Sequence, residues 1–230
     1  MIIFQLDEKD KSFPDPLLIS DEQREPNGLF AIGGDLSSER LIEAYSLGIF
    51  PWSDYRRAVL HWYCPIDRFV IFPNEVHISH SMRTLLNQNK YSVTIDTCFE
   101  NVIGRCSEKR IRIPGAWLGP QMVEAYTELH KIGIAHSVEV WDTSNQLVGG
   151  LYGIEINNCF FGESMFSDVP NGSKIALVYF SKIFESKRGR MIDCQFETAH
   201  LLSMGGRHIS YSEYMSILWP SGKRKISIDD

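Results

Sequence analysis

The sequence predicts an α+β fold in two parts: a small, loop-rich N-terminal domain over residues 1–72, and a larger domain over residues 73–230 that holds a mixed sheet with flanking helices. Three observations predict this division. Proline, glycine and aromatic residues crowd the stretch from Phe13 to about Phe72, and regular strand and helix periodicities begin near Tyr91. The chain of 230 residues is 43% hydrophobic, which suffices for a real core.

The N-terminal region contains one evident helix, from Ser37 to Leu47. Asp35 and Ser37 offer N-capping side chains, and Gly48 follows as a helix stop. Trp62 lies further on, in a short strand-like run. We therefore expect a small mixed domain with few regular elements.

Regular periodicity predicts the elements of the larger domain. Alternation of apolar and polar residues indicates strands, and apolar residues three and four apart indicate helices. In chain order we expect a strand (92–96), two helices (98–106 and 120–132), three strands (135–141, 147–154 and 159–166), a helix (173–185), a strand (190–195) and two helices (198–204 and 211–218). Turn-prone residues join the three consecutive strands, which predicts an antiparallel meander. This element order is typical of an acyltransferase-like (GNAT-like) sheet.

Composition excludes several classes of protein. The N-terminus lacks the basic and long apolar regions of an export signal, and no apolar run approaches the ~20 residues of a membrane-spanning helix, so we expect a cytoplasmic protein without membrane contact. The five dispersed cysteines form no CxxC pair, and no metal or nucleotide motif occurs, so no metal or cofactor is expected. The net charge of -6 limits nucleic-acid contacts to local basic clusters, at 56–57, 109–112, 187–190 and 223–225.

An acidic residue interrupts an apolar strand near its end. In the run from Phe161 to Ser167, alternation places Phe161, Glu163 and Met165 on one face. A carboxylate between hydrophobic side chains needs a partner or a shifted pKa. Glu163 is therefore a candidate catalytic residue, and a structural salt bridge to a neighbouring strand or to Lys174 is the alternative.

A second polar group ends the strand at 190–195. Alternation places Asp193 and Gln195 on one face, at the carboxyl end of a strand, where open α/β sheets tend to bind ligands. Cys194 points the other way and is expected to fill the core. Asp193 and Gln195 are thus candidate catalytic residues, with helix capping as the structural alternative for Asp193.

The loop at 167–174 argues against an acyl-CoA enzyme. Such enzymes bind pyrophosphate with consecutive backbone N–H groups from a glycine-rich turn. Here the loop has one glycine, an acid at Asp168, and Pro170, which has no N–H.

Six segments, in this order, resemble the bacterial leucyl/phenylalanyl-tRNA-protein transferase family. They are Pro26–Leu36, Gly48–Trp52, Ala135–Glu139, Leu147–Gly153, Phe161–Ser167 and Asp193–Gln195. The chain departs from the usual pattern of the family at Cys64–Arg68. The resemblance implies an acyltransferase-like catalytic domain and transfer of Leu or Phe, and weakly of Met, from aminoacyl-tRNA to acceptor proteins that begin with Arg or Lys, in the N-degron pathway of protein degradation.

The resemblance also implies roles for particular residues. Asp193 would take or attract the proton of the acceptor ammonium, and Gln195 would orient the amine or the ester oxygen. Glu163 would bind the cationic acceptor or help hold the aminoacyl group. The pocket for the amino-acid side chain would consist of Leu151, Phe161, Leu177, Phe180, Phe184 and Ile192. The tRNA would contact Trp52 and Trp117 through its terminal adenine, and Lys187, Arg188 and Arg190 through acceptor-stem phosphates.

Two other functions stay open at this point. One is a leucyl transferase that acts on acidic N-termini, and the other is a non-catalytic tRNA-binding adaptor. Peptides with acidic or basic N-terminal residues would separate a transferase for acidic N-termini from the family reaction. Binding of aminoacyl-tRNA without any transfer would indicate an adaptor.

Overall fold

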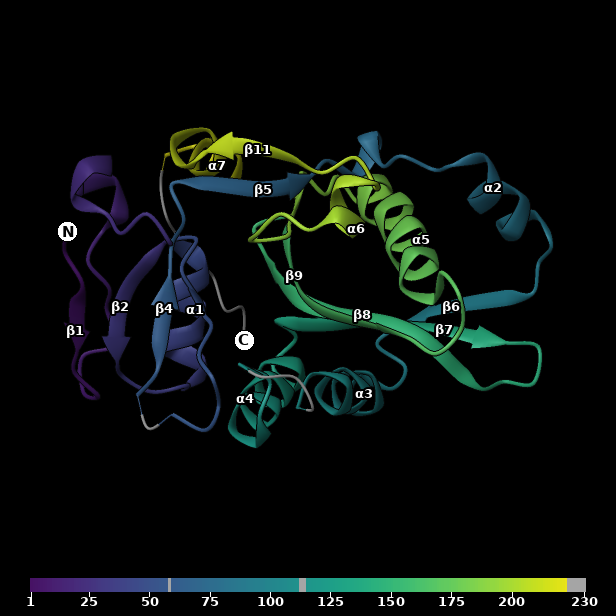
Figure 1. Cartoon of the computed structure of the whole chain (residues 1–230), viewed down its shortest axis with the longest axis horizontal. Coiled ribbons are helices and arrows are strands. Elements are labelled where there is room, and N and C mark those ends of the chain that lie inside the picture. Colours follow the sequence, from purple (N-terminus) through teal and green to yellow (C-terminus); the bar gives the residue numbers. More distant parts are fainter. Residues whose placement is uncertain (58, 112–114, 223–230) are drawn as a thin grey trace.

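The computed structural model describes residues 1–57, 59–111 and 115–222, which form two sheets and their helices (Figure 1). The smaller sheet has the strand order β1-β2-β4-β3. β1 is parallel to β2, and β4 is antiparallel to both of its neighbours. The elements of this part are β1 (Phe4–Leu6), η1 (Pro16–Leu18), η2 (Asp21–Gln23), β2 (Leu29–Gly33), α1 (Ser38–Ser46), β3 (Phe50–Pro51) and β4 (His61–Tyr63).

The larger sheet has seven strands in the order β11-β5-β10-β9-β8-β7-β6. Neighbouring strands are antiparallel except β10 and β9, which are parallel because helix α5 (Gly172–Ser186) carries the chain from the end of β9 back to the start of β10. The strands are β5 (Asp67–Ile71), β6 (Tyr91–Ile95), β7 (Ala135–Asp142), β8 (Leu147–Ile156), β9 (Cys159–Ser167), β10 (Met191–Asp193) and β11 (Arg207–Ser210).

Helices cover both faces of the larger sheet. α3 (Phe99–Ile111) and α4 (Pro120–Lys131) pack on one face, and α5 packs on the other (Figure 1). The remaining helices are η3 (Pro73–Glu75), α2 (His80–Asn87), α6 (Ala199–Leu202) and α7 (Tyr211–Leu218). One buried cluster lies under α5, and a second joins α3, α4 and the smaller sheet into one continuous core.

The predicted α+β class and the antiparallel meander are confirmed by the structure. Several features differ from the prediction. α3 continues to Ile111, five residues beyond the predicted end at Cys106, and the sequence pattern does not predict β5 or β11. Both strands pair with distant parts of the chain, so no local turn signal marks them.

The predicted division into domains after residue 72 stays a prediction. β4 pairs with β2 in the smaller sheet, whereas the next strand along the chain, β5, pairs with β10 in the larger sheet. The chain therefore leaves the smaller sheet between β4 and β5. Arg112 and residues 223–225, which belong to two of the predicted basic clusters, lie outside the described residues.

The strand observed at this place, β10, is shorter than the one predicted over 190–195, so strand alternation does not reach Gln195. β10 ends at Asp193, and Gln195 has a φ of 58°, in the left-handed region. The backbone turns there toward β5, because Cys194 donates its N–H to the Phe69 carbonyl at 2.9 Å. Strand alternation therefore stops at Asp193 and does not place Gln195, but the two residues are in contact, because the Gln195 N–H donates to Asp193 Oδ1 at 2.8 Å.

A bulge in β9 corrects the expected surroundings of Glu163. The register of β9 against β8 shifts between Tyr152 and Gly153, so Glu163 stands opposite no residue. Phe161 packs into the core beside α3 and α4, whereas Met165 packs against the cluster under α5. The prediction that Phe161, Glu163 and Met165 share one face is wrong, because the extra residue reverses the alternation.

Candidate active site

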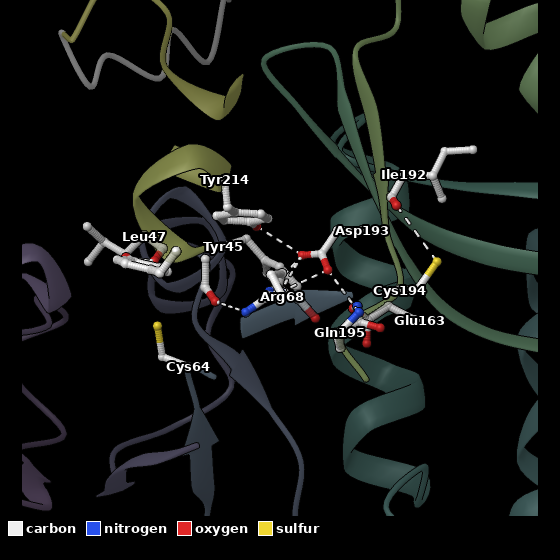
Figure 2. Close-up of polar contacts among 12 residues, drawn as sticks. Tyr45, Leu47, Cys64, Arg68, Glu163, Ile192, Asp193, Cys194, Gln195 and Tyr214 are labelled. Atoms are coloured by element: carbon white, nitrogen blue, oxygen red, sulfur yellow. Dashed lines mark hydrogen bonds and ion pairs between the residues drawn. The ribbon is translucent and has the colours of Figure 1, made fainter. Parts of the chain in front are cut away.

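Asp193, at the end of β10, is fully buried in a salt bridge with Arg68 of β5 (Figure 2). Arg68 Nε lies 2.9 and 3.0 Å from the two carboxylate oxygens of Asp193, and Arg68 Nη2 lies 2.6 Å from Oδ2. The Tyr214 hydroxyl donates to Oδ2 at 2.9 Å, and the Gln195 backbone N–H donates to Oδ1 at 2.8 Å. These donors occupy both carboxylate oxygens and hold Asp193 in place.

Arg68 is as tightly held as its partner. Its guanidinium lies 4.8 Å from the ring centroids of Phe50 and Tyr214, and Nη1 donates to the Gly48 carbonyl at 2.6 Å. Burial is the largest single influence on the pKa of Arg68 and lowers it, but the charge and hydrogen bonds of Asp193, together with Tyr214 and Cys64, outweigh burial and raise that pKa. Gly48 is required at this point, because its φ is +67° and a Cβ would lie 2.6 Å from the Tyr214 ring.

Glu163 is partly exposed and has no cation within salt-bridge distance in the part of the chain that the structure describes. The Tyr126 hydroxyl donates to Glu163 Oε2 at 3.0 Å, and Gln195 Nε2 donates to Oε1 at 3.2 Å. The hydroxyls of Tyr45 and Tyr126 lie 2.5 Å apart and extend this row. Burial raises the pKa of Glu163 to about 7, and the hydrogen bonds from both tyrosines partly oppose the rise. Glu163 is therefore the carboxylate that exchanges protons near neutral pH.

Two cavities meet at Glu163 and Gln195. The outer cavity has a volume of about 260 Å³, and its rings are those of Phe50, Trp52, Trp117 and Phe196. The inner cavity has a volume of about 100 Å³, and its apolar walls are Leu151, Phe160, Met165, Leu177, Ile192 and Leu201. Glu163, Gln195, Cys194 and Arg110 line both cavities, whereas Asp193 lines neither.

The inner cavity follows from the divergence of β9 and β10. The two strands pair only from Met191 opposite Cys159 to Asp193 opposite Phe161. Beyond this point β9 bulges at Glu163 and the other chain turns toward β5, so the sheet opens. The hydrogen bond between the side chains of Gln195 and Glu163 spans the opening.

The structure brings half of the predicted side-chain pocket together. Leu151, Leu177 and Ile192 line the inner cavity. The other three predicted residues lie elsewhere: Phe161 packs edge-on against Tyr45 at 5.1 Å between ring centroids, and Phe180 and Phe184 stack on each other at 5.1 Å behind the cavity wall. Phe160, which the pattern does not single out, supplies the aromatic wall.

The two predicted tryptophans both reach the outer cavity. Trp52 is 42% exposed and packs against Phe196 at 4.9 Å between ring centroids, while Trp117 is nearly buried. The predicted basic group lies apart from the cavities, at the opposite end of β10. Arg190 donates from its guanidinium to the Ile217 and Asn157 carbonyls at 2.8 and 2.7 Å, and Lys187 and Arg188 follow the end of α5. Phosphate binding by these three residues stays a prediction.

Sequence patterns miss the partners that set the chemistry of this site. Arg68, Tyr126 and Tyr214 lie 125, 37 and 21 residues from the carboxylates that they contact. The sequence offers one general signal: a buried carboxylate needs hydrogen-bond donors. It does not say which residues supply them.

Metal and membrane features are both absent from the described residues. Residues 1–57, 59–111 and 115–222 hold no group of three or more His, Cys, Asp or Glu side chains able to bind a metal ion. Across the same residues, none of the helices has the length and apolar character needed to span a membrane.

The fold and site together define an α+β protein with a seven-stranded mixed sheet and a carboxyl group of raised pKa between two cavities. Residues 70–219 match the family model of the leucyl/phenylalanyl-tRNA protein transferases, and residues 34–66 match the model of the N-terminal domain of the same family. The chain therefore belongs to the leucyl/phenylalanyl-tRNA protein transferase family.

Similar proteins carry the same family name. The chain is 51% identical to the leucyl/phenylalanyl-tRNA–protein transferase of Nitrosomonas eutropha over 84% of this chain and 82% of that protein. It is 46% identical to that of Cellvibrio japonicus over 90% of this chain and 86% of the relative. It is 43% identical to that of Anaeromyxobacter dehalogenans over 95% and 91% of the two chains.

Proposed function

We propose that this protein transfers leucine or phenylalanine from aminoacyl-tRNA to the N-terminal amine of acceptor proteins that begin with Arg or Lys, which marks these proteins for degradation in the cytoplasm. The observation that carries the proposal is the position of Glu163, a carboxyl group of raised pKa between an aromatic and an aliphatic cavity. Membership of the family supports the same reaction.

The two cavities fit the two ends of an aminoacyl-adenosine. The terminal adenine stacks among Trp52, Trp117 and Phe196 in the outer cavity, because flat aromatic walls bind any base through its π-face. The amino-acid side chain enters the apolar inner cavity. The ester bond then lies where the cavities meet, beside Glu163 and Gln195.

The reaction needs positioning and proton transfer, because the ester is already activated. A protein α-amino group has a pKa of roughly 7.7–8.0, so most of it is protonated at neutral pH. Glu163 accepts one proton from this ammonium, and the free amine attacks the ester carbonyl carbon. The C–N bond forms, the attacking nitrogen loses its second proton, and the bond from the carbonyl carbon to the ribose oxygen breaks. That oxygen leaves as a hydroxyl with one of the two protons, and the other leaves Glu163 for solvent. The step consumes no ATP.

Gln195 and Asp193 position these groups. The Gln195 amide bonds Glu163 and faces both cavities, so it orients the acceptor amine or the ester. Asp193 and Arg68 hold the backbone of Gln195 in its left-handed turn. Proton removal by Asp193 itself stays a prediction from resemblance. Its burial and its set of donors favour action through Gln195 instead.

The inner cavity favours leucine over phenylalanine. Its volume of about 100 Å³ is smaller than the ~150 Å³ of an apolar cavity that accommodates a benzene ring. A branched four-carbon side chain fits directly, whereas a phenyl ring displaces flexible walls such as Met165. Each methylene changes the selectivity by only ~1–3 kcal/mol, so methionine is a weak substrate as well.

One assay tests the proposal. Purified protein is incubated without ATP, with labelled Leu-tRNA or Phe-tRNA and peptides that begin with Arg, Lys, Asp or Glu. Labelling of the Arg and Lys peptides alone supports the proposal. Labelling of the Asp and Glu peptides would indicate a transferase for acidic N-termini, and tight binding of charged tRNA without labelling of any peptide would indicate an adaptor.

A further inference from the structure

Arg110 lies in the last turn of α3, where it lines both the outer and the inner cavity. Among the described residues that line either cavity, Arg110 is the one cation. Glu163 lines both cavities too, so the guanidinium and the carboxylate belong to the same junction.

Arg110 differs in its contacts from two other cations of the same helix. Arg105 and Lys109 both form ion pairs with Asp168. Within the described part of the chain, Arg110 makes no hydrogen bond or ion pair, although its charge acts inward on Tyr152 and Cys106. The pKa of both of these groups is raised, chiefly by burial, and Arg110 opposes the rise in each. Arg110 is itself exposed, and its charge lies within electrostatic range of both buried groups.

The helix dipole does not account for this placement. A cation in the last turn of a helix is favourable by about 0.3–1 kcal/mol wherever its side chain points. Lys109 supplies such a charge in the same turn and lines neither cavity. Of the two cations in this turn, only Arg110 lines the cavities.

We propose that Arg110 is a catalytic residue that stabilises the oxyanion of the tetrahedral intermediate. When the acceptor amine attacks, the carbon–oxygen π pair of the ester moves onto the carbonyl oxygen, which becomes negative. An Arg110 N–H donates to this oxygen until the pair returns and the bond to the ribose oxygen breaks. The proposal rests on the proposed function, which puts the ester at the junction of the cavities.

Position separates this role from phosphate binding. The phosphate of the terminal nucleotide lies on the far side of the nucleoside from the amino-acid side chain. A residue that serves only the phosphate would line the outer cavity, whereas Arg110 lines the inner one as well.

The test compares Arg110→Gln with Arg105→Gln, which removes the same charge from the same helix outside both cavities. Each variant and the wild type receive two donors, Leu-tRNA and leucyl-adenosine, an ester without phosphate. We expect Arg110→Gln to lower kcat about 100-fold with both donors, with little change in KM. Arg110→Lys, which keeps the charge without the planar fork, recovers part of the loss, and Arg105→Gln matches the wild type. Thermal unfolding confirms that the variants are folded.

Three results would overturn the proposal: equal kcat for Arg110→Gln and Arg105→Gln, a loss seen with Leu-tRNA but not with leucyl-adenosine, or a change confined to KM. The second result would assign Arg110 to a phosphate. If the wild type transfers leucine from neither donor, the proposed function fails, and the Arg110 proposal fails with it. If the wild type is active and one of the three results above is found, only the Arg110 proposal fails. The activity of the wild type therefore distinguishes the two failures.

Discussion

Replacement of Glu163 by Gln should stabilise the folded protein, and the gain should depend on pH. The pKa of Glu163 is raised from 4.5 to about 7 in the folded chain, with burial as the largest cause. Below pH 4.5 the carboxyl is protonated in both the folded and the unfolded state, so its ionisation has no cost. As the pH rises from 4.5 to about 7, the unfolded chain releases this proton while the folded chain keeps it, so the folded wild type loses stability relative to Glu163→Gln, and the difference levels off above pH 7.

The size of the effect follows from the same pKa values. At roughly 1.4 kcal/mol per pKa unit, the difference in unfolding free energy between the two proteins grows by about 3 kcal/mol from pH 4 to pH 8. For a chain of 230 residues this corresponds to roughly 6–12 °C in Tm. The amide introduced by Glu163→Gln keeps one acceptor oxygen, so loss of one hydrogen bond costs about 1 kcal/mol at every pH.

Urea unfolding of both proteins at pH 4, 5, 6, 7 and 8 measures this difference. Met165→Leu on the same strand is the control, because a swap of similar volume without an ionisable group shifts stability equally at every pH. A difference between Glu163→Gln and wild type that stays constant from pH 4 to pH 8 would refute the reasoning. It would mean that Glu163 ionises in the folded state as it does in water.

Three further outcomes are expected. Asp193→Asn leaves the buried charge of Arg68 without its partner and should cost about 3–5 kcal/mol in urea unfolding, against about 1 kcal/mol for Tyr214→Phe; similar costs would contradict a buried ion pair. Leu177→Ala enlarges the inner cavity and should raise the ratio of kcat/KM for Phe-tRNA over Leu-tRNA roughly tenfold, whereas an unchanged ratio would exclude this cavity as the side-chain pocket. Trp117→Ala should raise KM for charged tRNA by the equivalent of about 1–3 kcal/mol, and an unaltered KM would argue against stacking.

Much of the larger domain is predictable from local patterns. The helix predicted over 120–132 is observed over 120–131, and the three strands of the meander lie where alternation and turn residues place them. The apolar run at 69–72 also contains a strand, β5, but the sequence does not reveal that β10 and β11 are its neighbours. Pairing between distant segments depends on how the whole chain packs, and local periodicity carries no information on it.

The sequence by itself determined the class of fold and the family, and it singled out three polar residues, Glu163, Asp193 and Gln195, that the structure shows in contact. These conclusions rest on residue types and spacing, which are local properties. Only the tertiary structure decided which carboxylate is buried in an ion pair and which faces the cavities: Arg68 pairs with Asp193 from the neighbouring strand, and the bulge places Glu163 where two cavities meet. The physical reason is that desolvation and ion pairing depend on groups far apart in the chain, so a carboxylate acquires its pKa from the folded environment and not from its neighbours in sequence.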